Sequence, residues 1–94
     1  MRKYEVMYII RPDVEQEAVQ ALVEKFNSVI SNGGEVIKSD ILGKRRLAYE
    51  INKLREGYFV LTQFSATAEI VSELDRVMKI ADEVIRVLIV RDVA

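Results

Sequence analysis

Hydrophobic residues follow two periods along this chain, and the change from one period to the other predicts its elements. Residues 3–10 (KYEVMYII) are rich in aromatic and β-branched types and predict a strand. Arg11 and Pro12 end it, because proline disfavours regular structure on both sides. Asp13, with Gln16 three residues later, has the pattern of a capping pair and predicts a helix start. The apolar residues of that helix recur at three- and four-residue spacing: Ala18, Val19, Leu22, Val23, Phe26, Val29 and Ile30.

After this helix, the middle of the chain predicts a turn, a strand, a hairpin loop and a further strand. Residues 32–34 (NGG) are expected to end the helix with a glycine in the left-handed conformation. Residues 35–52 predict a strand, which Gly43 can divide into two pieces. Residues 53–57 predict a polar hairpin loop, and residues 58–64 predict a strand that is apolar on both faces and therefore central.

A second helix and a last strand complete the chain. Thr67 is expected to cap the helix, whose apolar stripe comprises Ile70, Val71, Leu74, Val77, Met78 and Ala81. Asp82 and Glu83 turn the chain into a strand over residues 84–90. The order is βαββαβ within a single domain spanning residues 1–94. We therefore predict an α+β fold, the ferredoxin-like sandwich, in which a four-stranded antiparallel sheet carries both helices on one face.

One face of such a sheet stays uncovered, and alternation assigns apolar residues to it. In the first strand, four residues are expected to face the helices: Tyr4, Val6, Tyr8 and Ile10. Met7 and Ile9 then face outward, as do Leu88 and Val90 in the last strand. We expect these four outward residues to form a docking surface for a partner protein. Alternation does not decide the faces of residues 35–42, where both parities hold apolar side chains.

Composition excludes several classes of function. The chain has no Cys and no His, which removes the commonest metal ligands and the commonest general base. Its acidic residues are spread along the predicted helices, as on solvated helix faces. We therefore expect no catalysis, no metal, no cofactor and a monomer when the chain is isolated. No apolar run approaches the roughly 18 residues of a membrane span, and no secretory segment is visible, so we expect a cytoplasmic location.

Charge is nearly balanced overall but unevenly distributed. The net charge of −1 argues against a protein that coats nucleic acid without selectivity. Residues 38–55 nevertheless carry +4, whereas residues 13–25 carry −3. Arg86 and Arg91 of the last strand are expected to be solvated. A neutral chain with a local basic patch is typical of a protein that contacts an anionic partner at one place.

Residues 43–51 (GKRRLAYEI) are the most informative segment. The glycine predicts a bulge at the entry to an alternating strand. Lys44 and Arg46 have the parity opposite to the apolar residues and are expected to point away from the core. Arg45 has the parity of core residues and reaches solvent only past the helix layer or through a bulge. Tyr49 is expected in the core more often than as a platform for bases. The alternative interpretation is an edge strand whose cations only prevent aggregation.

This motif and two others resemble one known family. The opening residues 1–5 (MRKYE), residues 43–51 and residues 56–59 (EGYF) are each similar to segments of the family of the sixth protein of the bacterial small ribosomal subunit. The length and the βαββαβ order agree with the same family. Many of its members extend beyond the last strand, whereas this sequence stops at Ala94, so we expect any contact made by such a tail to be missing.

The resemblance implies a structural component of the small (30S) ribosomal subunit that binds 16S ribosomal RNA. It also implies a heterodimer with a small basic protein, the eighteenth of that subunit, which would supply cationic charge that this chain lacks. The motif and the basic opening carry over RNA contacts, and charge position alone adds the last two of the following residues: Arg2, Lys3, Lys44, Arg45, Arg46, Lys53 and Arg55.

Two other functions fit the same topology. An RNA recognition motif stacks bases on sheet aromatics, and residues 57–60 (GYFV) resemble its third-strand signature. Tyr58 and Phe59 are adjacent, however, so they point to opposite faces and only one can be a platform. A regulatory module that binds a small ligand or self-associates through the open face would need no basic cluster. Gel filtration with and without RNA would distinguish these functions.

Overall fold

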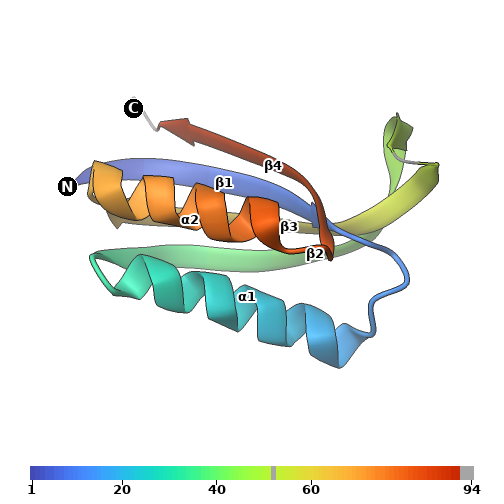
Figure 1. The fold of residues 1–94 in the computed structure, drawn as a ribbon, viewed down its shortest axis with the longest axis horizontal. Coiled ribbons are helices and arrows are strands. Elements are labelled where there is room, and N and C mark those ends of the chain that lie inside the picture. The colour runs from blue at the N-terminus through green and yellow to red at the C-terminus, as the bar shows by residue number, and fades with distance from the viewer. Residues whose placement is uncertain (52, 92–94) are drawn as a thin grey trace.

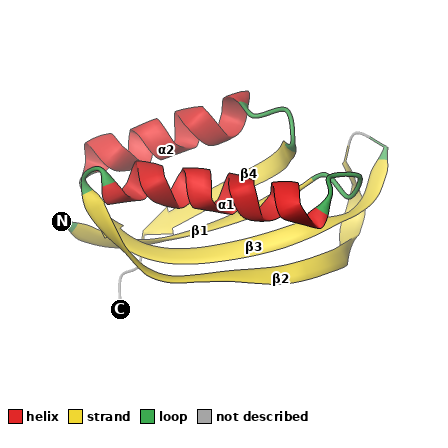
Figure 2. Cartoon of the chain, turned by 90° about the horizontal axis from the view of Figure 1, so that it is seen from below, coloured by secondary structure: helices red, strands yellow, loops and turns green. Residues whose placement is uncertain are grey.

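Two helices pack on one face of a four-stranded antiparallel sheet in a computed structural model that describes residues 1–51 and 53–91 (Figure 1, Figure 2). The strands lie in the order β2-β3-β1-β4. Each of the three pairs of neighbouring strands is antiparallel. The predicted ferredoxin-like sandwich is therefore confirmed. Its elements are β1 (Arg2–Ile10), α1 (Gln16–Ser31), β2 (Gly34–Ile51), β3 (Leu54–Ala66), α2 (Ala68–Ile80) and β4 (Val84–Arg91).

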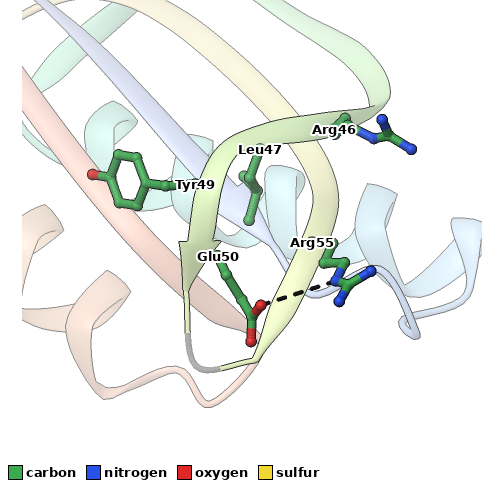
Figure 3. Close-up of a pocket in the computed structure, with 5 residues that line it drawn as sticks. All are labelled: Arg46, Leu47, Tyr49, Glu50 and Arg55. Carbon is green, nitrogen blue, oxygen red and sulfur yellow. Dashed lines mark ion pairs between the residues drawn. The ribbon is translucent and has the colours of Figure 1, made fainter.

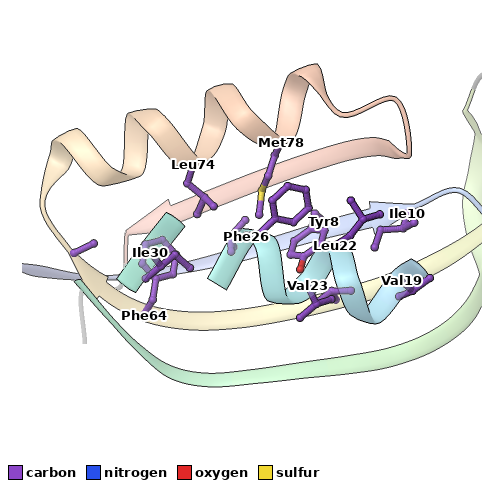
Figure 4. Close-up of a cluster of buried hydrophobic side chains, with 13 residues drawn as sticks. Tyr8, Ile10, Val19, Leu22, Val23, Phe26, Ile30, Phe64, Leu74 and Met78 are labelled. Carbon is purple, nitrogen blue, oxygen red and sulfur yellow. The ribbon is translucent and has the colours of Figure 1, made fainter. Parts of the chain in front are cut away.

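One hydrophobic core fills the space between the helices and the sheet (Figure 4). Val6, Tyr8 and Ile10 of β1 are fully buried there, on the face that alternation predicted. The Tyr8 ring meets the Phe26 ring of α1 edge-on, with centroids 5.4 Å apart. Each large apolar side chain buried in this way stabilises the fold by about 1.5–3 kcal/mol. The other fully buried members include Ile30, Val60, Phe64, Leu74 and Met78.

The two helices begin in different ways. Thr67 caps α2 as predicted, since its hydroxyl accepts a hydrogen bond from the Ile70 N–H at 3.4 Å. The prediction that Asp13 caps α1 is wrong: the cap residue is Glu15, without a side-chain bond. The Asp13 carboxylate instead accepts from the Arg11 guanidinium, with Nε and Oδ1 3.2 Å apart. Neither helix of the described residues is both long and apolar enough to cross a membrane.

The end of α1 does not use a left-handed glycine, so that prediction is also wrong. Its cap residue, Asn32, is right-handed, with φ of −68°. Positive φ angles occur among the described residues at Gly43 and Lys53 alone. Gly34 is required for a different reason, because a β-carbon there would lie 2.3 Å from the Ser65 carbonyl oxygen. The glycine thus allows β2 to start close against β3.

Strands β2 and β3 run past the ends of the other two strands and bend there (Figure 1). The pairing of β1 with β3 ends at Ile10 opposite Tyr58. We call the end that these two strands form, residues 44–51 of β2 and 54–57 of β3, the arm. The arm is a two-stranded ribbon without a helix layer of its own.

The arm corrects the predicted hairpin. Residues 53–57 were expected to form a loop, but β3 already begins at Leu54. Asn52, the last residue of the predicted strand, lies outside the described residues. The register also assigns the ambiguous residues of β2: Ser39 lies opposite Thr62 on the helix side, and Asp40 lies on the open side.

Candidate nucleic-acid interface

A bulge at Leu42 and Gly43 sets the direction of the cations that follow. The register moves from Ile41 opposite Val60 to Gly43 opposite Phe59, so β2 carries one more residue than β3 here. Gly43 has φ of 93°, a conformation that other residues rarely adopt. The predicted bulge is confirmed. Its extra residue reverses the alternation of every side chain between it and the next irregularity of β2.

Three consecutive cations leave the ribbon in different directions after this bulge. Lys44 lies opposite Tyr58, with its Nζ 5.2 Å from the ring centroid, in a cation–π contact. Arg45 lies on the other face, and its Nε donates to the Leu42 carbonyl oxygen at 3.4 Å. Arg46 points away from the body of the arm (Figure 3). All three are exposed, as expected for Lys44 and Arg46, and none forms an ion pair with a carboxylate of the described residues.

The arm widens toward its tip. Strand β2 carries four residues (47–50) where β3 carries Arg55 alone. The widening leaves a hollow of about 390 Å³ that is lined by Arg46, Leu47, Tyr49, Glu50 and Arg55 (Figure 3). Arg55 pairs with Glu50, with Nε and Oε2 3.9 Å apart. Because the Arg55 side chain is 86% exposed, this pair is weak and leaves the guanidinium available to an anion.

Tyr49 lies outside the core, so the prediction of a core position is wrong. Tyr49 is 59% exposed, whereas Leu47 of the same strand is 8% exposed. The Tyr49 hydroxyl accepts a hydrogen bond from the Arg86 Nη1, and the Arg86 Cζ lies 5.8 Å from the ring centroid. Arg86 is therefore more than a solvated strand end. Nothing in the spacing of the sequence links these two positions, which only the folded sheet brings together.

The basic residues expected to bind RNA lie in two places. Five of them lie together at one end of the sheet: Lys44, Arg45, Arg46 and Arg55 in the arm, and Lys53 at its hairpin turn. Arg2 and Lys3 instead pair with Ala66 and Ser65 at the opposite end of β1. Arg2 and Ile10 are eight steps apart along an extended strand, a distance of about 25 Å. The structure thus groups five of the seven residues and separates the other two.

Three of the four residues expected to form a docking surface are accessible. Leu88 and Val90 of β4 are 48% and 45% exposed, and Met7, opposite Leu88, is half-buried. Ile9 is only 5% exposed, so the expectation that it is uncovered is wrong. The base of the arm packs on it: a β-carbon at Gly57 would lie 2.5 Å from the Ile9 Cγ2.

The two adjacent aromatic residues of β3 separate as the sequence predicted. Tyr58 packs against the core on the helix side, and Phe59 lies opposite Gly43 and Ile9 on the open side. Only Phe59 could then serve as a platform for a base on the open face of the described β3. The paired platforms of an RNA recognition motif are not available on this strand.

The chemistry of the arm is that of hydrogen-bond donors with positive charge. No group of three or more Asp, Glu, His or Cys side chains within the described residues could hold a metal ion. Outside the arm, burial raises the pKa of Tyr8 in the core. On α2, the hydrogen bond between Glu73 and Arg76 lowers the pKa of the carboxyl group and raises that of the guanidinium. The arm, with guanidinium and ammonium groups on a protruding ribbon, is suited to binding phosphates.

Comparisons with known proteins all identify the same family. A family model described as "Ribosomal protein S6" matches residues 3–91. The small ribosomal subunit protein bS6 of Desulforamulus reducens is 60% identical over 93 residues, which cover 98% of each chain. That of Exiguobacterium sibiricum is 56% identical over the same shares. The crystal structure of 30S ribosomal protein S6 from Thermotoga maritima has a TM-score of 0.92 at 33% identity, covering 97% of this chain and 87% of that one.

Proposed function

The chain belongs to the ribosomal protein S6 family, and from this membership we propose that it binds 16S ribosomal RNA through its arm, together with a small basic partner protein, the eighteenth of the subunit. The family is a non-enzymatic component of the small ribosomal subunit, which works in the cytoplasm. The RNA contact and the heterodimer are the parts that we add to this membership.

The observation that carries the RNA contact is the exposure of Lys44, Arg45 and Arg46 on a protruding ribbon. Each cation lacks a carboxylate partner among residues 1–51 and 53–91. Three adjacent positive charges repel one another, and an RNA backbone relieves this repulsion by placing phosphates between them. Because Lys44 and Arg45 lie on opposite faces of the ribbon, the arm can contact phosphates on both sides.

The partner surface is supported by the open sheet face. Leu88 and Val90 remain accessible there beside Met7, and Leu61 is paired with Met7 on β3. A partner that covers these side chains would remove apolar area from water. A basic partner also suits a chain of net charge −1 that has to enter an RNA particle.

The experiment is RNA binding by the chain with its protein partner, at several salt concentrations. Lys44→Ala with Arg46→Ala should lower the slope of log affinity against log salt by about two, one for each phosphate contact. The matched control is Arg76→Ala with Lys79→Ala, which removes two cations of α2 that pair with carboxylates. The control should leave the slope unchanged.

Stability decides whether a change in binding has this cause. Exposed charges contribute about 0–1 kcal/mol to folding, so both double variants should unfold at nearly the wild-type temperature. Equal slopes for the wild type and the arm variant would mean that the cluster is only a solvated edge. Arg2→Ala with Lys3→Ala then tests the second group: an altered slope would extend the RNA surface to the start of β1.

A further inference from the structure

Arg86 and Tyr49 join the arm to the far side of the sheet. Arg86 belongs to β4, an edge strand, and Tyr49 belongs to β2, the other edge strand. Two strands lie between them in the sheet, yet the Arg86 Nη1 donates to the Tyr49 hydroxyl and the guanidinium lies by the ring. The arm must therefore turn back over the open face of the sheet to make this contact.

Apolar packing also holds the arm in this orientation. Leu47, at 8% exposure, and Ile9, at 5% exposure, line a common hollow of about 270 Å³ with Phe59 and Arg86. This packing is apolar and has little directional preference. The Arg86–Tyr49 hydrogen bond is directional, because a planar guanidinium donates in a fixed geometry. It therefore restricts the direction in which the arm leaves the sheet.

We infer that Arg86 is a positioning residue, which acts through Tyr49 to hold the arm so that Arg46 and Arg55 face the RNA. The inference rests on the proposed function, because it assigns a role toward the same RNA contact. Tyr49 lies three residues from Arg46 in β2, and both line the hollow that Arg55 also lines. A rotation of the arm about its base would move all these groups together. Fixing it in advance reduces the entropy that RNA binding has to offset.

Arg86 has a different role from the arm cations, and salt dependence separates the two. A residue that contacts phosphate releases counterions, so its removal lowers the salt slope by about one. A residue that only positions others changes affinity at all salt concentrations alike. Arg86→Gln should therefore weaken RNA binding about five- to tenfold, the combined effect of an exposed cation–π contact and one hydrogen bond, without changing the slope.

The test uses the full chain with its protein partner and 16S ribosomal RNA. The variants are Arg86→Gln, Tyr49→Ala and the two combined, with Arg76→Gln of α2 as the control for loss of one positive charge. Because both single changes break the same contact, the double variant should bind no more weakly than the weaker single variant. Hydrogen exchange of the free chain should be faster at the arm amides in Arg86→Gln, and Arg86→Lys should restore part of the affinity.

The outcomes distinguish this inference from the proposed function. Wild-type binding that Arg86→Gln leaves unchanged would overturn the inference and leave the proposed function standing. A slope lowered by about one would also overturn it, since Arg86 would then contact phosphate directly. Additive losses in the double variant would mean that Tyr49 and Arg86 act separately, again against the inference. Absence of RNA binding by the wild-type complex would overturn both.

Discussion

The side chain of Ile9 occupies the space beside Gly57 where any other residue would place its β-carbon, 2.5 Å from the Ile9 Cγ2. This contact joins β1 to the base of the arm. It explains why an apolar residue on the helix-free face of the sheet is 5% exposed. The open face is thus divided: the end near the arm is covered by the chain itself, and the end with Leu88 and Val90 is accessible.

We predict that Ile9→Glu destabilises the fold. A carboxylate there would be buried without a partner, which should lower the free energy of unfolding by about 3 kcal/mol or more. Urea unfolding followed by circular dichroism measures this change. Leu88→Glu is the matched substitution on the same face at 48% exposure, and it should change the free energy of unfolding by less than about 1 kcal/mol. Equal costs for the two variants would contradict the division of this face.

We predict that Leu88→Glu weakens binding of the basic partner protein while the chain stays folded. The new charge would be desolvated in the interface, so affinity should fall at least about tenfold. A pull-down or calorimetric titration with the purified partner checks this. Ile80→Glu, at an apolar position of α2 that is 66% exposed, is the control and should bind normally. Unaltered affinity of Leu88→Glu would place the partner on another surface.

The order of the six elements could be predicted because each buries one side and so leaves a periodic apolar pattern. The arm could not, because most of its side chains are exposed and so leave no periodic apolar pattern. Residues 53–57 are polar in sequence, and polarity alone does not separate a loop from an exposed strand. The bulge was predictable from Gly43, since the residue type itself reports the backbone conformation.

The site was predictable as far as it depends on local sequence. The sequence predicted the exposure of Lys44 and Arg46, but the same parity placed Tyr49 in the core, where it does not lie. The positions of Tyr49, Ile9 and Arg86 depend on how far the arm turns over the sheet, which is a tertiary property. Arg86 and Tyr49 are 37 residues apart in the chain, and no local pattern encodes their contact.

We predict different costs for alanine at two glycines of β2. Gly43 has φ of 93° and open space around its α-carbon, so Gly43→Ala should cost only the backbone strain, about 1–2 kcal/mol. At Gly34 the added carbon would meet the Ser65 carbonyl oxygen at 2.3 Å, so Gly34→Ala should cost more, about 3 kcal/mol. Urea unfolding measures both. Gly43→Asn should cost less than Gly43→Ala, because Asn tolerates positive φ better; the reverse order would contradict strain as the cause.

The last prediction concerns Tyr8, whose hydroxyl is buried beside α1 without a hydrogen-bond partner in the described residues. An unpaired buried hydroxyl costs free energy, so Tyr8→Phe should leave the free energy of unfolding at neutral pH unchanged or raise it by about 1 kcal/mol. Loss of about 1 kcal/mol or more in Tyr8→Phe would instead mean that the hydroxyl is satisfied in solution.

Alkaline pH makes the same residue a sharper test. Burial raises the pKa of Tyr8 in the folded chain, whereas the unfolded chain ionises near the ordinary value of about 10. Below that value both states hold the proton and stability is unaffected. Above it the unfolded state alone loses the proton, so the free energy of unfolding should fall, by about 1 kcal/mol between pH 10 and 11 from this group. Tyr8→Phe has no hydroxyl to ionise at this position, so its free energy of unfolding should fall by a correspondingly smaller amount. Urea titrations of both chains across this interval check the difference, and parallel curves would show that Tyr8 ionises in the folded chain as readily as in the unfolded one.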